Sequence, residues 1–314
     1  MFLKPLLQCL VFITISISGF AQAVPTVSVG RLVILPQVAS KKITSRAVYI
    51  WLPTQFSSAT AQQFSVLYMH DGQMLFDSTI TWNKDAWMVA NVADSLQNTG
   101  SVKPFIIVGI ANGGSTRHAD YFPQDVFENL PAATQTQFLA AARGNGASVF
   151  NQTSLRANDY LQFLQQQVKP VVDSVLGFST LPSNNYLMGS SMGGLISVYA
   201  LCKQPHFWAG AACLSTHWPG VFTLENNPFP QAMLSYINTH LPPAKAGKKL
   251  YMDCGTATLD ALYPAIQQQA NTLIQQKGYG AQQFQAQLVP GAAHTEAAWR
   301  ARLATPLLFL FSKK

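Results

Sequence analysis

Charged residues are scarce in this 314-residue sequence, where they make up 11% against about 25% in typical soluble domains. The basic residues are also scattered, because no run of Lys or Arg is longer than two. A nucleic-acid-binding protein usually gathers its cations on one face or stripe, so the formal charge of +7 does not predict such a partner. Apolar residues make up 48%, which is ample material for a core and excludes a disordered chain.

Cysteines and metal-binding motifs are also few. Of four cysteines, Cys202, Cys213 and Cys254 each lie in an apolar run, where a thiol behaves as a small buried hydrophobe. The sequence has no CxxC pair, and His70-Asp71 is not supported by an HxH, an HExxH or a carboxylate cluster. We therefore expect no metal and no cofactor, and leave open whether any of the three cysteines pair.

Residues 1–23 have the pattern of a secretory signal peptide. Lys4 precedes a mostly apolar stretch over 6–17, and small residues follow up to Ala21 and Ala23, after either of which cleavage is expected. The stretch is shorter than the roughly 20 apolar residues of a membrane span, and no later segment reaches that length without charges or turn residues. We expect an exported protein, periplasmic or extracellular, with no stable membrane anchor.

The remainder, 24–314, is expected to form one α/β domain. Short apolar runs predict strands at 27–35, 46–53, 64–70, 104–110, 185–190, 208–215, 249–254 and 283–289. Helical spacing falls at 83–97, 159–176, 192–203, 260–277 and 296–311. The first two strands alternate as antiparallel strands do, and the others are nearly continuous, so the alternation predicts a mostly parallel central sheet with helices on both faces. The long segments 111–156 and 216–247 are expected to be loops that wall a binding site.

The sequence GSSMG at 189–193 matches the G-x-S-x-G motif of a nucleophile elbow. A strand-like stretch precedes it and a helix-like stretch follows, which is the setting that the motif requires. Ser191 would then lie at a helix N-terminus, where free N–H groups and the helix dipole favour developing negative charge. We expect Ser191 to be the nucleophile and Ser190 to be a spacer.

A serine hydroxyl needs a base, and in this kind of fold the order is Ser, acid, His. His294 lies in a loop of small residues after the last predicted strand and before the last helix, the expected place for the base. Only three acidic residues lie between Ser191 and His294: Glu225, Asp253 and Asp260. Asp260 follows the end of a strand and is the preferred acid, with Asp253 as the alternative.

The transition state also needs two N–H donors, and we expect these to be the backbone groups of Met192 and Gln73. The substrate cavity is expected to be lined from 73–87, 111–125 and 216–247. Side chains in these segments that are candidates for substrate contact are Trp82, Arg117, Tyr121, His217 and Trp218.

Several stretches together resemble the putative-esterase family of α/β-hydrolases, which includes siderophore esterases, feruloyl esterases and S-formylglutathione hydrolases. They are LYMHDGQMLFD (67–77), IIVGIANGG (106–114), RHADYFP (117–123), YLMGSSMGG (186–194), YMDCGTATLD (251–260) and GAAHTEAAWRARL (291–303). The resemblance implies an α/β-hydrolase fold and the same roles for Ser191, His294, Gln73 and Met192. Family members often carry the acid about three residues after the glycine that matches Gly255, where this chain has Thr258.

These features favour a secreted serine esterase that works through an acyl-enzyme on a small-molecule ester, such as a siderophore, a hydroxycinnamoyl ester or an acylated sugar. Two alternatives stay open: an acyltransferase on the same triad, and a non-catalytic binding protein of the same fold.

Overall fold

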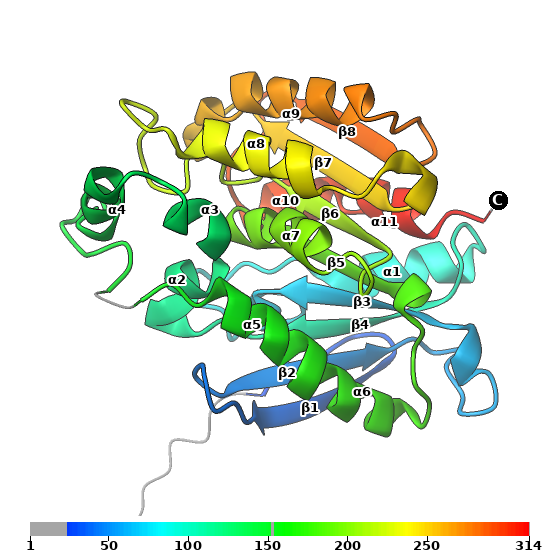
Figure 1. The fold of residues 1–314 in the computed structure, drawn as a ribbon. Coiled ribbons are helices and arrows are strands. Elements are labelled where there is room, and N and C mark those ends of the chain that lie inside the picture. Colours follow the sequence, from blue (N-terminus) through cyan, green and yellow to red (C-terminus); the bar gives the residue numbers. More distant parts are fainter. Residues whose placement is uncertain (1–23, 152–153, 314) are drawn as a thin grey trace, which may run out of the picture.

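The computed structural model describes residues 24–151 and 154–313, and its centre is one mixed sheet (Figure 1). The predicted signal peptide, 1–23, lies outside the described residues. The strands are β1 Arg31–Val38, β2 Arg46–Leu52, β3 Ser65–His70, β4 Phe105–Ile110, β5 Asn185–Ser190, β6 Gly210–Leu214, β7 Lys249–Gly255 and β8 Phe284–Val289. Their order across the eight-stranded sheet is β1-β2-β4-β3-β5-β6-β7-β8. β2 pairs antiparallel with β1 and β4, and all other pairs are parallel, which confirms the predicted α/β class.

Helices cover both faces of the sheet (Figure 1). The α-helices are α1 Val89–Asn98, α2 Arg117–Tyr121, α3 Gln124–Glu128, α4 Ala132–Leu139, α5 Ala157–Phe163, α6 Lys169–Leu176, α7 Met192–Lys203, α8 Phe229–His240, α9 Pro264–Gln276, α10 Glu296–Arg302 and α11 Ala304–Phe311. Short 3-10 turns are η1 Ala61–Gln63, η2 Gly72–Met74, η3 Gly114–Thr116, η5 Pro182–Asn184, η6 Ala244–Ala246 and η7 Thr258–Leu262, and η4 Leu164–Val168 is a π-helical segment.

Alternate side chains of each strand enter two separate cores, as a period of two requires. In β3, Val66 and Tyr68 pack on the face covered by α5 to α9, whereas Leu67 and Met69 pack on the face covered by α1, α10 and α11. All four are fully buried, which explains why the strand reads as a continuous apolar run. The sheet is thus a layer buried on both faces. The loops that carry the candidate site leave its carboxyl edge.

Two sequence predictions were wrong in extent. The helix expected from residue 83 begins at Val89, because Lys84 and Met88 have positive φ and the Asn83 side chain accepts from the N–H of Asp85. The segments expected to be long loops contain helices: α2 to α4 in the first, and α8 in the second.

The three cysteines of the described chain are buried, free thiols, and burial raises the pKa of each above its usual value. They are therefore protonated and serve as apolar filling. Within 24–151 and 154–313, no helix has the length and hydropathy to cross a membrane.

Candidate active site

Ser191 lies at the sharp turn between β5 and α7. Its backbone has φ 58° and ψ −123°, a conformation that residues other than glycine rarely adopt. The turn needs small neighbours, because a Cβ on Gly189 would lie 2.7 Å from the backbone of Gly193. The Ser191 N–H donates to the carbonyl of Leu214 at 2.9 Å, which ties the turn to β6. This is the strained strand–turn–helix geometry of a nucleophile elbow.

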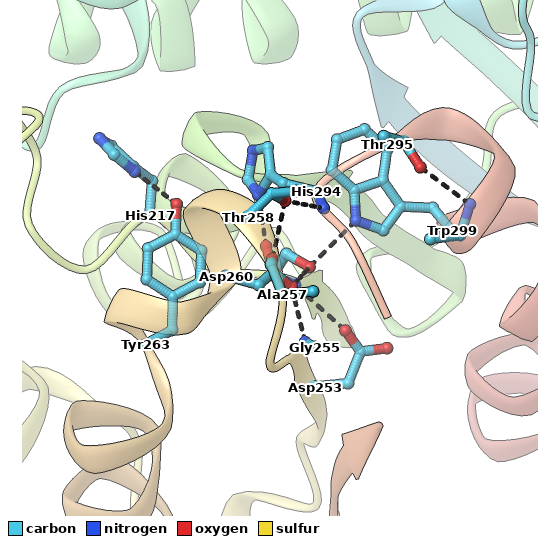
Figure 2. Close-up of polar contacts among 12 residues, drawn as sticks. His217, Asp253, Gly255, Ala257, Thr258, Asp260, Tyr263, His294, Thr295 and Trp299 are labelled. Atoms are coloured by element: carbon cyan, nitrogen blue, oxygen red, sulfur yellow. Dashed lines mark hydrogen bonds and ion pairs between the residues drawn. The ribbon is translucent and has the colours of Figure 1, made fainter. Parts of the chain in front are cut away.

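His294 and Asp260 form a direct pair near the carboxyl edge of the sheet (Figure 2). The His294 Nδ1 lies 2.5 Å from Oδ1 of Asp260. Burial favours the neutral carboxyl, but the hydrogen bonds from His294 and Ser215 outweigh it and lower the pKa of Asp260. An ionised carboxylate only accepts hydrogen bonds, so a neutral His294 ring carries its proton on Nδ1 and presents the lone pair of Nε2. Of the two acids left open by the sequence, the structure brings Asp260 to the imidazole.

Two aromatic rings flank the His294 imidazole (Figure 2). Tyr263 and Trp299 meet it edge-on, with ring centroids 5.8 Å and 5.0 Å away. The Tyr263 hydroxyl lies 2.7 Å from Nδ1 of His217. Tyr263 therefore packs against one side of the His294 imidazole while its hydroxyl is held by His217.

The loop that carries His294 is fastened to the end of β7. The N–H of Thr256 donates to the carbonyl of Ala292 at 3.2 Å. Gly255 permits this approach, because a Cβ there would lie 2.1 Å from the same carbonyl oxygen. Thr258, at the position where the resemblance leads one to expect an acid, accepts a hydrogen bond from the His294 N–H at 2.8 Å instead.

Ser215, at the end of β6, connects the Asp260 carboxylate to the rest of the interior. Its hydroxyl donates to Oδ2 of Asp260 at 2.5 Å and accepts from the Trp299 indole at 3.0 Å and from Arg302 at 2.9 Å. Arg302 in turn donates two bonds of 3.0 Å to Asp253. Asp253 therefore holds Arg302 and, through Ser215, supports the Asp260 carboxylate. It does not contact the imidazole.

We expect the change Ser215→Ala to lower both stability and any turnover at this site. It leaves one indole N–H and one guanidinium N–H unpaired in the interior, which costs about 1–3 kcal/mol, and it frees one oxygen of Asp260. The measurements are urea unfolding at pH 7 and kcat on a simple ester. A matched control is Thr180→Val, which removes another buried hydroxyl, bonded to Asn185 at 2.8 Å, away from the cavity. Equal kcat losses in the two variants would contradict a positioning role for Ser215.

Backbone N–H groups of Gln73 and Met192 are free of helical partners. Met192 is the first residue of α7, and the first hydrogen bond of η2 comes one residue after Gln73, from the N–H of Met74. The two turns are in contact, because a Cβ on Gly193 would lie 3.3 Å from the Cβ of His70. The predicted pair of donors therefore comes from two adjacent turns.

An ion pair holds the η2 turn in place. Asp71, with φ 57°, accepts bonds from Nε and Nη2 of Arg117 at 2.6 and 2.7 Å and from the Asn112 amide at 2.7 Å. Burial opposes ionisation of this carboxyl, but Arg117 and Asn112 outweigh it and lower the pKa of Asp71. Asn112 also donates its N–H to the side chain of Gln73 at 3.1 Å. The strained turn is thus braced from β4 and α2.

A cavity of about 430 Å3 opens over Ser191 and His294. Its lining is drawn from the η2 turn, the segment before α1, the loop after β4 and the start of α10. The lining residues are His70, Asp71, Gln73, Met74, Trp82, Asn83, Trp87, Asn112, Arg117, Arg143, Ser190, Ser191, His294, Thr295, Glu296 and Trp299. Of the side chains predicted to contact substrate, Trp82 and Arg117 line this cavity, and Trp82 is 83% exposed.

The other three predicted contact residues are buried and do not line the cavity. Tyr121 and Trp218 are fully buried, and the Trp218 indole donates to Gln267 at 3.0 Å. His217 is buried against Tyr263. The physical reason differs between them: Tyr121 lies in α2, which packs on α5 and α7, whereas His217 and Trp218 begin a segment that folds back as α8 against α7 and α9.

The model of the putative esterase family matches residues 41–310, which is most of the chain. The chain belongs to the putative esterase family. A curated relative of this chain is the uncharacterized protein YbbA of Bacillus subtilis (strain 168), 22% identical over 182 residues, or 58% of this chain. The match spans about 61% of that relative's length.

Solved structures share the esterase fold at low sequence identity. An IroE-like serine hydrolase from Shewanella oneidensis superposes with a TM-score of 0.65 at 18% identity, over 90% of this chain and 80% of that one. The enterobactin esterase of Shigella flexneri gives 0.60 at 18%, over 91% and 60%. A feruloyl esterase module from Clostridium thermocellum, complexed with sinapinate, gives 0.57 at 18%, over 91% and 89%. These likenesses show the α/β-hydrolase-like fold.

Several residues around the candidate site were not predicted from the sequence. Their positions carry some signal, since Ser215 ends a predicted strand and Tyr263 closely follows Asp260. Trp299 lies three residues after the first residue of α10, about one helical turn from the loop that carries His294. This spacing directs its side chain toward that loop. Arg143 lies in a segment expected to be a wall, where no pattern distinguished it from its neighbours.

Three buried histidines near the cavity are expected to make the folded protein sensitive to acid. Burial lowers the pKa of His70 to about 4 and that of His118 to about 3, and it also lowers the pKa of His217. In the unfolded chain each titrates near 6.5, so the unfolded state takes up these protons first. Their contribution to stability is full above pH 6.5 and is lost as the pH falls toward 4.

We therefore expect the free energy of unfolding to fall from pH 6.5 to pH 4, by up to about 1.4 kcal/mol per pH unit for each histidine. Urea unfolding at several pH values measures this. His118 lies among the rings of Phe122, Phe150 and Phe222, so His118→Phe is a conservative change of shape. This variant is expected to show a smaller change in the free energy of unfolding with pH, by the contribution of one histidine. An unchanged slope in this variant would contradict the assignment.

Proposed function

We propose that this chain is an exported serine esterase in which Ser191, His294 and Asp260 form a catalytic triad. The observation that carries the proposal is the 2.5 Å contact between the buried Asp260 and His294, which lines the same cavity as Ser191 on its strained elbow. This contact leaves Nε2 of His294 free to accept a proton. Family membership supports ester hydrolysis as the reaction.

In the first half-reaction the Ser191 hydroxyl transfers its proton to Nε2 of His294 while Oγ forms a bond to the ester carbonyl carbon. The carbonyl oxygen becomes an oxyanion and is stabilised by the N–H groups of Gln73 and Met192. Asp260 stays ionised and stabilises the imidazolium. The tetrahedral intermediate then collapses, the alcohol leaves with the proton from Nε2, and an acyl-enzyme remains.

In the second half-reaction water replaces the alcohol. His294 takes a proton from the water, whose oxygen attacks the acyl carbon, and the same N–H groups stabilise the second oxyanion. Collapse of this intermediate breaks the bond to Ser191, which regains its proton from Nε2. The carboxylic acid is released and the triad returns to its starting state.

Two measurements on the purified mature protein test the reaction type. A fluorophosphonate is expected to label Ser191, as read from the mass of the modified peptide. Partition of the acyl group between water and an added alcohol then separates hydrolysis from acyl transfer. Failure to label would favour a non-catalytic binding protein, and predominant transfer would favour the acyltransferase.

The substrate class is a further part of the proposal. Solved structures that share the fold are described as enterobactin and feruloyl esterases, so siderophore-type and hydroxycinnamoyl esters are the first candidates. The exposed indole of Trp82 at the cavity is suited to stacking on an aromatic or sugar ring. A panel with a ferric triscatecholate lactone, methyl ferulate and an acetylated sugar, ranked by kcat/KM, decides between them.

Export is inferred from residues 1–23 alone. N-terminal sequencing of the protein from its natural source is expected to find the chain starting after Ala21 or Ala23. An intact N-terminus at Met1 would contradict it.

A further inference from the structure

Arg143 places a second guanidinium at the cavity besides Arg117. It lies in the turn between α4 and α5, where its N–H donates to the carbonyl of Ala147 and its carbonyl accepts from the N–H of Gly146, both at 2.8 Å. The guanidinium carbon sits 5.2 Å from the centre of the Phe222 ring, in a cation–π contact. The side chain is thus held from both its backbone and its flank while it lines the cavity.

The charges around the cavity are not balanced locally. Arg117 is matched by Asp71, through two hydrogen bonds. Glu296 accepts from the Asn83 amide at 2.8 Å and lies in the first turn of α10, where the helix dipole also favours a negative charge. Among residues 24–151 and 154–313, by contrast, no carboxylate lies within 4.0 Å of the Arg143 guanidinium.

The surroundings of Arg143 disfavour an unpaired cation. Burial, and then the charge of Arg117, lower the pKa of Arg143. An anion placed between Arg143 and the catalytic serine would offset both effects. Arginine is well suited to this, because its planar fork can give two charge-assisted hydrogen bonds to one carboxylate or similar oxyanion.

We propose that Arg143 binds an anionic group of the substrate, so that the esterase prefers esters that carry a negative charge over neutral esters of the same shape. A carboxylate or another planar oxyanion has the required chemistry. The inference rests on the proposed esterase function, and it assigns to Arg143 the selection of charge. The triad performs the same reaction on both kinds of ester.

Matched esters test the proposal. On the acyl side, 4-nitrophenyl hemisuccinate is compared with methyl 4-nitrophenyl succinate; on the alcohol side, 4-acetoxybenzoate is compared with methyl 4-acetoxybenzoate. In Arg143→Gln the ratio of kcat/KM for the charged ester to that for the neutral ester is expected to fall about tenfold to a hundredfold in at least one pair. Arg143→Lys is expected to retain part of the ratio, and to lose more of it as salt is added.

A control separates the local effect from net charge. Arg31→Gln removes one positive charge from the exposed start of β1, away from the cavity, and is expected to leave both ratios unchanged. Thermal unfolding of each variant shows that the fold is retained. Equal losses for charged and neutral esters in both pairs, or no charge preference in the wild type, would overturn the proposal.

A binding measurement keeps the two proposals distinguishable. Calorimetry follows 4-nitrophenyl hemisuccinate binding to Ser191→Ala and to Ser191→Ala/Arg143→Gln. Weaker binding to the double variant supports the anion site even if no ester is turned over, whereas equal binding refutes it. Absence of turnover of both the charged and the neutral esters by the wild type counts against the esterase function alone.

Discussion

Ser191→Ala is expected to reduce kcat on 4-nitrophenyl acetate by about 10,000-fold or more, because no other group can form the acyl-enzyme. The backbone donors of Gln73 and Met192 remain, so a small residual rate over water is expected. The serine is 9% exposed and its removal takes away one oxygen atom, so the fold is retained. The measurement is steady-state hydrolysis, with fluorophosphonate labelling of the same preparations.

Ser190 provides the matched control, since it is the other hydroxyl in the same motif. It ends β5 and is part of the sheet, with its neighbour carrying the strained backbone. We expect Ser190→Ala to retain at least about a hundredfold more activity than Ser191→Ala. Ser190→Ala keeps the Ser191 hydroxyl, whereas Ser191→Ala keeps only the oxyanion donors, which account for a fraction of the rate. Similar activity in the two variants would show that Ser191 is not the nucleophile.

Asp260→Asn is expected to lower kcat by about 1,000-fold to 10,000-fold with little change in KM. The carboxylate fixes the His294 proton on Nδ1 and stabilises the imidazolium, and an amide does neither. The volume of the side chain is unchanged, so the loss belongs to proton transfer. Rates measured from pH 5 to pH 9 are expected to stay low throughout.

Asp253→Asn is the counterpart that separates the two acids. Asp253 is fully buried and paired with Arg302, and breaking a buried pair costs about 3–5 kcal/mol of stability. We expect this variant to unfold at lower urea concentration and, where folded, to keep more activity than Asp260→Asn. The reverse result, with Asp253 needed for turnover and Asp260 dispensable, would contradict the triad.

The positions of the serine and the imidazole could be predicted from the sequence because each depends on local order. Gly189 and Gly193 on either side of Ser191 indicate a tight turn. The small residues before His294 indicate a loop after the last strand. The sequence favoured Asp260 over Asp253 only by its place beyond the strand end, because both lie beside the end of β7. The choice depends on which side chain the sheet directs at Arg302 and which at the imidazole.

The limits of the sequence are clearest at the cavity walls. Trp218 was predicted to contact substrate because it lies in a segment expected to wall the cavity, but it is fully buried and its indole donates to Gln267 of α9. Arg143 gave no signal, because its importance lies in what surrounds it: Phe222 under its guanidinium, Arg117 nearby and no acid beside it. Contacts of this kind join segments that are far apart in the sequence, so they leave no periodic pattern from which they could be predicted.

The attachment of Ala292 to the end of β7 at Gly255 has a mechanical consequence. The segment that carries Asp260 and the loop that carries His294 are thereby joined to each other, whereas Ser191 follows β5, two strands away, and does not share this attachment. Directed evolution for bulkier substrates is therefore best aimed at exposed wall positions such as Trp82. A side chain introduced at position 255 is expected to separate the imidazole from its carboxylate, because its Cβ would lie 2.1 Å from the Ala292 carbonyl oxygen.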